Sequence, residues 1–591
     1  MSSDSTDSDS TLNDDGWRLA SEGKLSVKTP WMNAYGEVPA HLEYSTRSMC
    51  GEVFHIRDLY PKNIAYTFMG KKTNYCQAVN EIEKCAKALK ALGVKPDEKV
   101  TICMPNCPQA VTMFYAINMI GAIANMIHPL SSENEIAFYL KDSKSVLALT
   151  LDQFFWKFEK IQNDVKLPKL IIADIRDALS PLMAVGYTLT SKIKKVPRCE
   201  WVTLWKDFMK GGESFSGDYS ENRKPEQPAV MLYSGGTTGV TKGILLSNLN
   251  FNALSAQIRA MSNVPEIPGK SMLAVMPMFH GFGLGVSIHS MLTNVAYCIL
   301  FPRFTPKSYA KLIKKTKPNF IAGVPSLYEV LLRNNYLEGA DLSCLMGVFS
   351  GGDSLSIELK NRFDKFLSEH KCPVPVREGY GTTECVTASC LTPYHIGKEG
   401  SIGIPLPDMY FKIVKPGTEE EVPYGDEGEI CLAGPTVMME YVNQPSETAD
   451  TKRLHKDGLT WIHTGDLGVM DAEGFIYFRQ RIKRMIVTNG YNVYPSNIEN
   501  VLDSNEYVHM SCVIGVKDPI KIQKVKAFVM LKPGVTPSDE VKQKILSYCK
   551  KHIARYALPY DIEFRDQLPK TLVGKVAYRV LEEEEAQKER Q

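Results

Sequence analysis

The amino-acid sequence predicts an α/β fold, with a large N-terminal α/β region followed by a smaller α+β domain. Short apolar runs rich in β-branched residues recur between segments of helical periodicity over most of the chain, which is typical of layered α/β structure. From about Arg481, strands and helices alternate over a compact stretch of roughly 110 residues, the size of a small separate domain. With 591 residues, the chain is also too long for a single hydrophobic core.

The strands expected in the large region are short and apolar, as in largely parallel sheets buried on both faces. They are Val100–Met104, Val146–Leu151, Leu170–Ala173, Val230–Tyr233, Met272–Val275, Phe320–Val324 and Leu345–Phe349. The most apolar stretch, Val111–Ile127, is interrupted by two asparagines and a glycine. We therefore expect a buried helix and turn there, and no segment that crosses a bilayer.

The C-terminal region is expected to alternate strands with helices. The expected strands lie near Met485–Thr488, Cys512–Val516 and Val525–Leu531, and the helices near Ser496–Asp503, Ser538–His552 and Glu582–Glu585. The junction Arg481–Arg484 is a candidate hinge. We therefore expect three parts: a flexible acidic arm and lead-in at 1–45, a large domain at 46–480 and a C-terminal domain at 481–591.

The composition is ordinary for a soluble globular protein, with 44% hydrophobic and 23% charged residues. The net charge of +2 disfavours a nucleic-acid-binding protein. The 14 cysteines contain no C-x-x-C pair, which favours buried reduced thiols in a cytoplasmic protein over a structural zinc site. Residues 1–16 are rich in Ser and Asp, so we expect a disordered segment rather than a signal peptide.

The most informative segment is Tyr233–Gly243, which holds four glycines, three threonines and Lys242 after a short buried strand. Glycines let backbone N–H groups turn toward one point, the hydroxyls add donors, and the lysine adds positive charge. The segment therefore predicts a cradle for an oxyanion, most simply a polyphosphate. It is not the P-loop motif, which needs Gly before the lysine and a hydroxyl residue after it. Here Thr241 precedes the lysine and Gly243 follows it.

A second segment, Glu378–Glu384, combines glycines, an aromatic residue, two threonines and two glutamates. Glu384 is suited to hold Mg²⁺, which prefers hard oxygen ligands shared with phosphates. Tyr380 could stack on a purine ring. A glycine-rich turn that ends in a surface glutamate is the simpler alternative.

Two further segments add charged residues. Asp466, in a glycine turn of Trp461–Gly468, could accept hydrogen bonds from both hydroxyls of a ribose. Arg481 could add a second contact to the ribose or a phosphate. Leu568–Lys575 ends in Gly-Lys, which suggests a lysine presented on a flexible loop, although such a lysine alone is typical of solvated surface charge.

These four segments, in this order and spacing, resemble the adenylate-forming superfamily of acyl-CoA synthetases, luciferases and peptide-synthetase adenylation domains. The resemblance spans nearly the whole chain after about residue 50 and extends to Met276–His280, Gly428–Ile430 and Gly490–Pro495. It implies a distorted β-barrel within the large region and a mobile C-terminal domain. It also implies an active enzyme that uses ATP, Mg²⁺ and, as cosubstrate, CoA. This chain departs from the family pattern at Thr241, where proline is usual.

The resemblance assigns roles to individual residues. The β- and γ-phosphates of ATP would be held by Ser234, Gly235, Gly236, Thr237, Thr238, Gly239 and Lys242. The adenine pocket would be lined by Gly352, Asp353, Ser354, Glu378, Gly379 and Tyr380. Thr383 would contact the α-phosphate, and Asp466 and Arg481 the ribose. The metal ligands would be Glu384 and Thr237. The catalytic residues would be Lys575, Glu384, Thr237 and His280. CoA would be bound by Lys483, at the hinge, with Gly490 and Tyr491.

Three features resemble the long-chain fatty-acid branch of the superfamily: Pro30–Tyr35, the insertion Ile172–Lys195 and Val493–Pro495. They imply a ligase for a long- or medium-chain fatty acid, with His280 gating the acyl pocket. An aryl acid such as a cinnamate, a steroid acid, or a carrier protein in place of CoA remain alternatives. A luciferase-like oxygenase and an inactive ATP-binding protein are further alternatives. Ser350–Leu355 mimics a phosphopantetheine attachment site, but the chain has no room there for a carrier domain.

The insertion Ile172–Lys195 has an apolar middle and a basic end that contains Lys192, Lys194 and Lys195. A segment of this kind could rest on a membrane surface, where fatty acids partition. A helix packed on the protein surface explains the same pattern equally well. The oligomeric state does not follow from the sequence.

Overall fold

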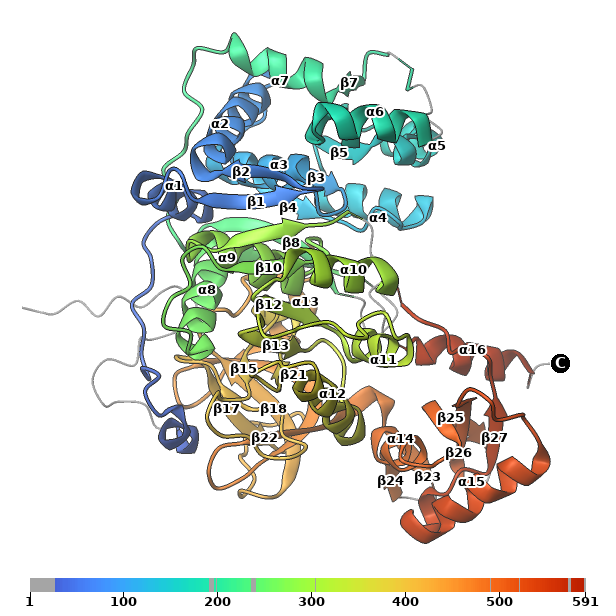
Figure 1. Cartoon of the computed structure of the whole chain (residues 1–591). Helices are drawn as coiled ribbons and strands as arrows, with labels where there is room; N and C mark the ends of the chain where they lie inside the picture. The colour runs from blue at the N-terminus through green and yellow to red at the C-terminus, as the bar shows by residue number, and fades with distance from the viewer. Residues whose placement is uncertain are drawn as a thin grey trace, which may run out of the picture.

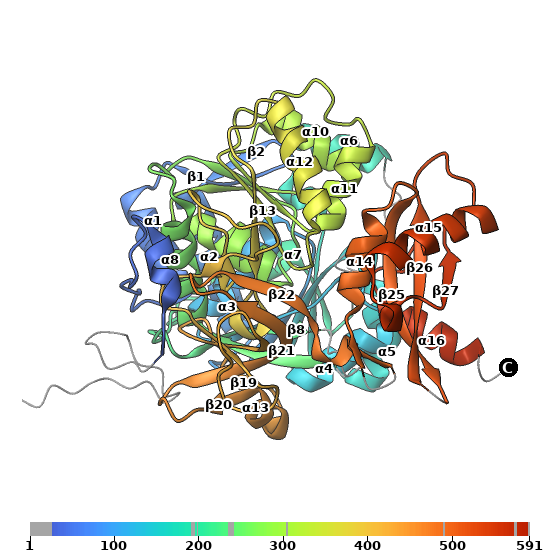
Figure 2. The same ribbon diagram turned by 90° about the horizontal axis from the view of Figure 1, so that it is seen from below.

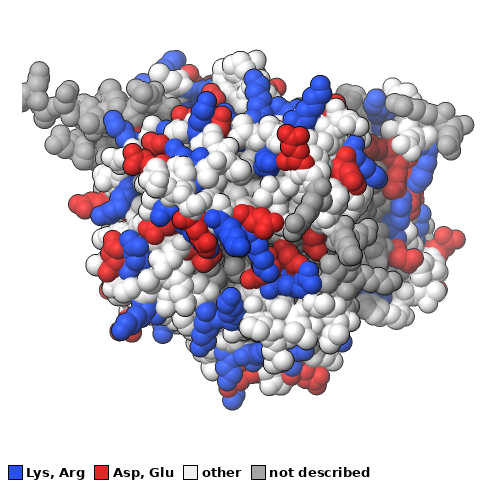
Figure 3. All heavy atoms as spheres, turned by 90° about the horizontal axis from the view of Figure 1, so that it is seen from above, with Lys and Arg blue, Asp and Glu red and all other residues white. Residues whose placement is uncertain are grey.

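The computed structural model describes residues 27–190, 196–197, 199–234, 241–302, 305–488, 491–519, 521–571 and 576–588. It has the predicted α/β organisation, with two large mixed sheets, a smaller antiparallel sheet and a C-terminal α+β domain (Figure 1). Within these ranges no helix is long and apolar enough to cross a membrane. Lys, Arg, Asp and Glu are interspersed on the face drawn in Figure 3, in line with a net charge of +2.

The first sheet has eight strands in the order β19-β9-β8-β4-β3-β5-β6-β7. Its strands are β3 (Lys99–Cys103), β4 (Ile123–Met126), β5 (Leu147–Leu151), β6 (Lys169–Ala173), β7 (Val202–Leu204), β8 (Pro228–Ser234), β9 (Lys242–Ser247) and β19 (Glu440–Tyr441). The pairs from β8 to β7 are parallel, whereas β8, β9 and β19 pair antiparallel. The hairpin β8–β9 therefore brings both ends of the Gly/Thr segment to one edge of the sheet.

The second sheet has nine strands in the order β16-β15-β14-β13-β12-β10-β11-β1-β2. Its strands are β1 (Ile64–Phe68), β2 (Lys71–Asn74), β10 (Ser271–Ala274), β11 (Tyr297–Leu300), β12 (Phe320–Gly323), β13 (Gly347–Ser350), β14 (Val376–Tyr380), β15 (Cys390–Leu391) and β16 (Ile404–Pro405). The pairs from β14 to β1 are parallel. The segments Gly351–Ser354 and Gly381–Glu384 therefore follow neighbouring parallel strands, at the edge where α/β proteins bind ligands.

The largest hydrophobic core unites residues of both sheets with several helical elements. They include α1 (Met49–Leu59), α2 (Tyr75–Ala91), α3 (Pro108–Met119), α8 (Asn248–Ser262) and η4 (Phe282–His289). Every α3 residue from Gln109 to Met119 is buried, which explains why its sequence is apolar all round. The expected turn follows at Gly121, with φ +73°, and leads into β4, a strand that the sequence did not predict.

Further helices cover the outer faces of the two large sheets. On the first sheet, α4 (Glu133–Ser143) and α5 (Phe155–Val165) share a core with β5 and β6. On the second, α10 (Pro306–Thr316), α11 (Pro325–Arg333) and α12 (Ile357–Glu369) form another. Other helices are α6 (Pro181–Thr190), α7 (Trp205–Glu213), α9 (Ser290–Thr293) and α13 (Pro445–Thr451).

The third sheet is antiparallel, and its described ladder is not closed into the distorted barrel that the resemblance implied. Its strands are β17 (Tyr410–Val414), β18 (Glu427–Ala433), β20 (Lys452–Leu454), β21 (Thr460–Met470) and β22 (Ile476–Arg481). The described ladder runs β17-β18-β21-β20, with β22 also on β21, and is therefore an open path. In the β18–β21 ladder Cys431 pairs with His463, but Glu429 pairs with Leu467, so Thr464, Gly465 and Asp466 bulge out.

The C-terminal domain has its own sheet and core, set to one side of the large region in Figures 1 and 2. Its strands are β23 (Ile486–Thr488), β24 (Tyr491–Val493), β25 (Val508–Asp518), β26 (Ile522–Leu531) and β27 (Asp561–Phe564). Its helices are α14 (Pro495–Asp503), α15 (Asp539–His552) and α16 (Tyr578–Lys588). Every strand and helix expected in this region is present, although β25, β26 and α16 are longer than expected.

Candidate active site

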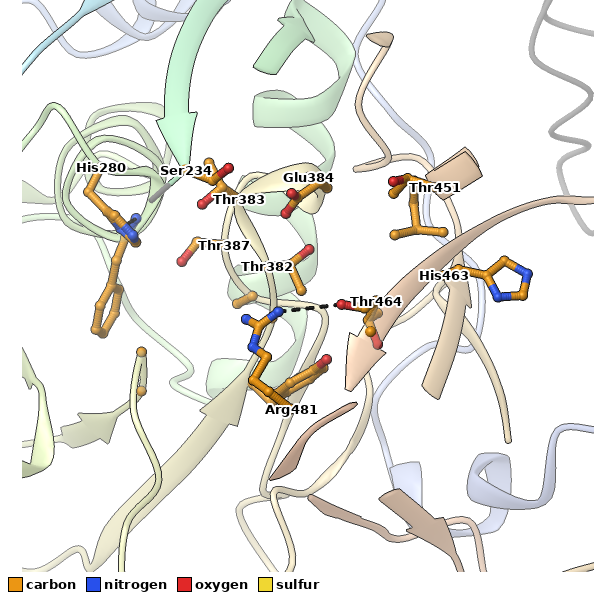
Figure 4. A pocket seen from close by; sticks show the side chains of 18 of the residues that line it. Ser234, His280, Thr382, Thr383, Glu384, Thr387, Thr451, His463, Thr464 and Arg481 are labelled. Carbon is orange, nitrogen blue, oxygen red and sulfur yellow. Dashed lines mark hydrogen bonds between the residues drawn. The ribbon is translucent and has the colours of Figure 1, made fainter. Parts of the chain in front are cut away.

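A cavity of about 960 Å³ lies where the three sheets of the large region meet the C-terminal domain. Its walls come from the ends of β8, β9, β13 and β14, from η4, β21 and β22, and from Thr571 and residues 576–579. Figure 4 shows His280 on one side of this cavity and His463 on the other. Thr383, Glu384 and Arg481 lie between them.

The Gly/Thr segment enters the cavity wall at both of its ends. Ser234 ends β8, Lys242 begins β9, and the two residues pair across the hairpin. The predicted phosphate ligands between these ends lie outside the described residues: Gly235, Gly236, Thr237, Thr238 and Gly239.

Lys242 is held by two groups that the sequence did not single out. Its ammonium forms an ion pair with Glu447 of α13 and lies 4.5 Å from the ring centroid of Tyr441. The Tyr441 hydroxyl donates to Glu384 Oε1 at 2.7 Å. Burial and the Glu384 charge raise the pKa of Tyr441, which therefore stays protonated as a donor. Tyr441 thus contacts both Lys242, which is expected to bind phosphate, and Glu384, which is expected to bind the metal.

The end of β14 supplies three of the predicted adenine residues, in different environments. Gly379 and Tyr380 line the cavity. Glu378 is buried, accepts a hydrogen bond from the Leu355 backbone N–H at 3.3 Å, and does not line the cavity. Burial raises the pKa of its carboxyl to about 8. Glu378 therefore supports the neighbouring loop in this structure.

That loop follows β13 and contains the other predicted adenine residues. Gly352, with φ +82°, lines the cavity. Asp353 and Ser354 are exposed and do not line it.

Asp466 and Arg481, the two predicted ribose residues, lie at paired positions of β21 and β22. Arg481 Nε lies 2.8 Å from Asp466 Oδ1, and the Tyr380 hydroxyl donates to Asp466 Oδ2 at 2.6 Å. The Asp466 charge raises the pKa of Arg481. Arg481 also donates to the Thr464 carbonyl at 3.4 Å, the contact drawn in Figure 4. Asp466 is fully buried beneath these partners, while Arg481 lines the cavity.

A buried polar chain fixes the bulge that carries Asp466. Glu429 Oε1 accepts from the Gly465 N–H at 3.0 Å, and its Oε2 lies 3.0 Å from His463 Nδ1. His463 Nε2 lies 3.0 Å from His455 Nε2. Burial, Lys412 and His463 lower the pKa of His455 to about 4, so it is neutral near pH 7. The sequence motif W-I-H-T-G-D contained His463, but no sequence signal linked it to Glu429.

His280 stands at the apolar end of the cavity, where its Nδ1 accepts from the Phe282 N–H at 3.2 Å. It precedes η4, a π-helix whose residues are all buried. Such helices are rare and occur often at functional sites.

A Cβ at Gly281 would lie 1.7 Å from the Val386 carbonyl oxygen, so only glycine fits there. Val386 itself has φ +63°, and Thr387 N–H donates to the Cys385 carbonyl at 2.7 Å across it. This is a γ-turn, a strained conformation for a β-branched residue.

The site residues predicted in the C-terminal domain lie in different places: one lines the cavity and another is exposed on the surface. Lys483 lines the cavity. Tyr491 is 56% exposed and stacks on Tyr556, with ring centroids 4.6 Å apart. Gly490 and Lys575 lie outside the described residues. Thr571 and Val576, on either side of the segment with Lys575, both line the cavity.

Two family models match this chain. The first, for an AMP-binding enzyme, covers residues 55–442, and the second, for the C-terminal domain of that enzyme, covers residues 497–575. The first match alone spans more than half of the chain. This chain belongs to the AMP-binding enzyme family.

Curated proteins and solved structures that are similar to this chain support its membership of this family. A long-chain-fatty-acid–CoA ligase of Bacillus subtilis (strain 168) is 32% identical over 571 residues, which are 95% of this chain and 99% of the relative. ATP-bound MatB from Rhodopseudomonas palustris superposes with a TM-score of 0.78 at 24% identity, over 91% of this chain and 99% of that one. The anthranilate CoA ligase AuaEII, solved with anthranoyl-AMP, has the same TM-score and identity over 93% and 98%. The structural matches show the adenylate-forming fold, and the family membership makes this chain an AMP-forming ligase.

Proposed function

We propose that this protein is an ATP-dependent acyl-CoA ligase that activates a fatty acid of long or medium chain. The observation that carries the proposal is a single cavity with a charged end at Lys242 and Glu384 and an apolar end at η4. The fatty-acid–CoA ligase at 32% identity over nearly the full length supports the same substrate class.

The apolar end suits a hydrocarbon chain. It is lined by Ile258, Phe282, Val286, Phe349, Ala388, Leu391 and Leu406. Among these described residues there is no charge to recognise an amino-acid substrate. His280 lies where the chain would enter, and we propose it as the gate.

ATP would bind between the β8–β9 hairpin and the bulge of β21. We propose that Lys242 and the segment 235–240 hold the β- and γ-phosphates, and that Thr383 contacts the α-phosphate. Gly352, Gly379 and Tyr380 would face the adenine. A ribose hydroxyl would compete with the Tyr380 hydroxyl for Asp466 Oδ2, because that oxygen already accepts from Tyr380.

The residues present fit a magnesium ion. Glu384 lines the cavity near Lys242 and offers a hard oxygen donor, as Mg²⁺ requires. We propose that Glu384 and Thr237 hold the ion. Bound there, Mg²⁺ would neutralise phosphate charge.

The chemistry follows from positioning and charge. A carboxylate attacks the α-phosphorus of ATP, which gives acyl-AMP and pyrophosphate, and the CoA thiol then displaces AMP. Lys575 would bridge the carboxylate and the α-phosphate in the first step. The C-terminal domain would then rotate about Lys483 and bring Gly490 and Tyr491 toward the pantetheine arm.

A pyrophosphate-release screen tests the proposal. The full chain is incubated with ATP, Mg²⁺ and CoA across fatty acids of increasing length, aryl acids and bile acids, and the thioester is identified by mass. We expect fatty acyl-CoA as the main product. A strong aryl response beside a flat response to every fatty acid would reject the substrate class. Pyrophosphate exchange with no CoA thioester would reject CoA as acceptor and favour a carrier protein.

A further inference from the structure

Helix α6 (Pro181–Thr190) turns its large apolar side chains toward solvent. Leu182 and Leu189 are 84% and 82% exposed, the highest values among the large hydrophobic residues of the described chain. Val185 is 59% exposed, and Met183 and Tyr187 are each 39% exposed. Figure 1 places α6 at the periphery of the molecule.

The three most exposed of these residues form one face of the helix. Leu182, Val185 and Leu189 are spaced by three and four residues, so they project on the same side. Ala184, on the opposite side, packs against the main core. The Thr188 hydroxyl, also away from that face, accepts from Arg176 Nη1 at 3.4 Å. The helix is thus attached by a small residue and a hydroxyl, with its apolar face outward, which is the reverse of an ordinary surface helix.

Such a face indicates a partner, because contiguous exposed apolar surface of this kind marks interaction sites. The terminal segment 1–16 of the chain is rich in Ser and Asp, so it has too few apolar side chains to cover it. Helix α6 itself carries no charged residue, and Lys192, Lys194 and Lys195 follow it in the sequence. Lys206 in α7 is 76% exposed, with its ammonium 3.0 Å from Asp177 Oδ1. Apolar side chains beside cations match an anionic lipid surface.

We propose that α6 is a membrane-contacting helix that inserts Leu182, Val185 and Leu189 into the interface of an anionic lipid bilayer. The helix would lie in the plane of the interface and not span it. The contact would place the enzyme on the phase into which fatty acids partition. It does not depend on the proposed substrate, because it is tested without substrate.

The test is co-sedimentation of the full chain with vesicles of phosphatidylcholine alone and of phosphatidylcholine with phosphatidylglycerol. The variant carries Leu182→Ser and Leu189→Ser. The matched control carries Leu59→Ser and Leu130→Ser, which are 58% and 60% exposed elsewhere on the surface. We expect at least about tenfold weaker binding to the anionic vesicles for the α6 variant, from the apolar surface lost, and no change for the control.

Three outcomes would overturn the proposal: no binding of the unaltered chain to anionic vesicles, equal binding of all three proteins, or equal loss in the variant and the control. Size-exclusion chromatography tests for a fourth outcome that would overturn it. If the chain self-associates, the α6 variant does not, and neither binds vesicles, the partner of α6 is a second copy of this chain. Thermal unfolding and ATP binding verify that the variant is folded.

Discussion

At the scale of single residues, the charged groups around the cavity are paired with one another. Lys242 contacts Glu447, Glu384 accepts from Tyr441, and Asp466 is shared by Tyr380 and Arg481. Each pair satisfies a partly buried charge that would otherwise be costly. A nucleotide that binds here must therefore exchange these contacts for its own.

Glu447 provides a direct test of that exchange. It competes with phosphate for Lys242, so Glu447→Gln should lower the KM for ATP. We expect about a threefold decrease, because the glutamate side chain is 48% exposed and its pair is partly screened. Lys242→Met should raise the same KM by roughly tenfold or more, since a charge-assisted hydrogen bond is lost. Steady-state kinetics with varied ATP measure both, and an unchanged KM in Glu447→Gln would show that the pair does not compete with ATP.

Glu378 predicts a specific dependence of stability on pH. Its pKa is about 8 in the folded chain against the ordinary 4.5 of a glutamate carboxyl, because it is buried. The folded state therefore holds this proton more tightly, and its contribution to stability is lost as pH rises from 4.5 toward 8. Glu378→Gln keeps the acceptor for Leu355 and removes the titration. We expect equal stability near pH 4.5 and a variant more stable by on the order of 1–3 kcal/mol near pH 8.

Urea unfolding of both proteins at several pH values measures this difference. Parallel pH profiles for the unaltered chain and Glu378→Gln would contradict the assignment.

Site residues that belong to a sequence motif could be predicted from the sequence. The side chains that contact them could not. The sequence marks Lys242, Glu384, Asp466 and Arg481 by their neighbours, and the structure places three of them on the cavity wall and Asp466 beneath it. Glu447 lies on an exposed helix 205 residues from Lys242, with no local signal. Such a contact depends on tertiary structure, which no local pattern encodes.

At the scale of elements, one bulge in the third sheet determines where the ribose residues lie. The register shift between Glu429 and Cys431 leaves Thr464, Gly465 and Asp466 outside the ladder. Glu429 then fixes this bulge through the Gly465 N–H. The sequence showed a glycine turn here, but a bulge is defined by its partner strand, which the sequence did not identify.

Removing that support should loosen the ribose site alone. Glu429→Ala leaves the Gly465 N–H and His463 without their acceptor, so we expect the KM for ATP to rise about tenfold. The KM for the acid should change little, because the apolar end of the cavity is formed by other elements. Glu429→Gln keeps an oxygen for Gly465 and should recover most of the loss. Equal effects of both substitutions on both substrates would indicate a general structural defect.

At the scale of the whole molecule, the C-terminal domain contacts the large region through its strand β25. His509 of β25 lies 3.3 Å from Glu329 of α11, which also binds Arg362 at 2.6 Å. Burial and nearby cations, Arg333 and Arg362 first, lower the pKa of His509 to about 3, so it is neutral at pH 7. The same orientation brings Thr571 and Val576 to the cavity and leaves Tyr491 exposed. This arrangement suits the first half-reaction.

The C-terminal domain would have one orientation for acyl-AMP formation and another for thioester formation. His509→Ala should therefore shift the balance between these two orientations. Loss of the His509–Glu329 contact across the interface should slow acyl-AMP formation by roughly two- to tenfold. Thioester formation from preformed acyl-AMP should be unchanged or faster, because the competing orientation is no longer disfavoured. Single-turnover measurements of each half-reaction give both rates. A slower second step would show that this contact does not belong to the first orientation.

Lys575 tests whether the two half-reactions depend on different residues of the C-terminal domain. We expect Lys575→Ala to slow acyl-AMP formation by at least about 10²-fold, the effect of losing one preorganised charge at the reacting phosphate. Thioester formation from synthetic acyl-AMP and CoA should survive, because the lysine would have rotated away from the cavity. Lys570→Ala is a suitable control, since it removes a nearby lysine that is absent from the cavity wall. If Lys575→Ala slowed both half-reactions equally, the lysine would act on a step common to both, and a rotating C-terminal domain would no longer explain the two reactions.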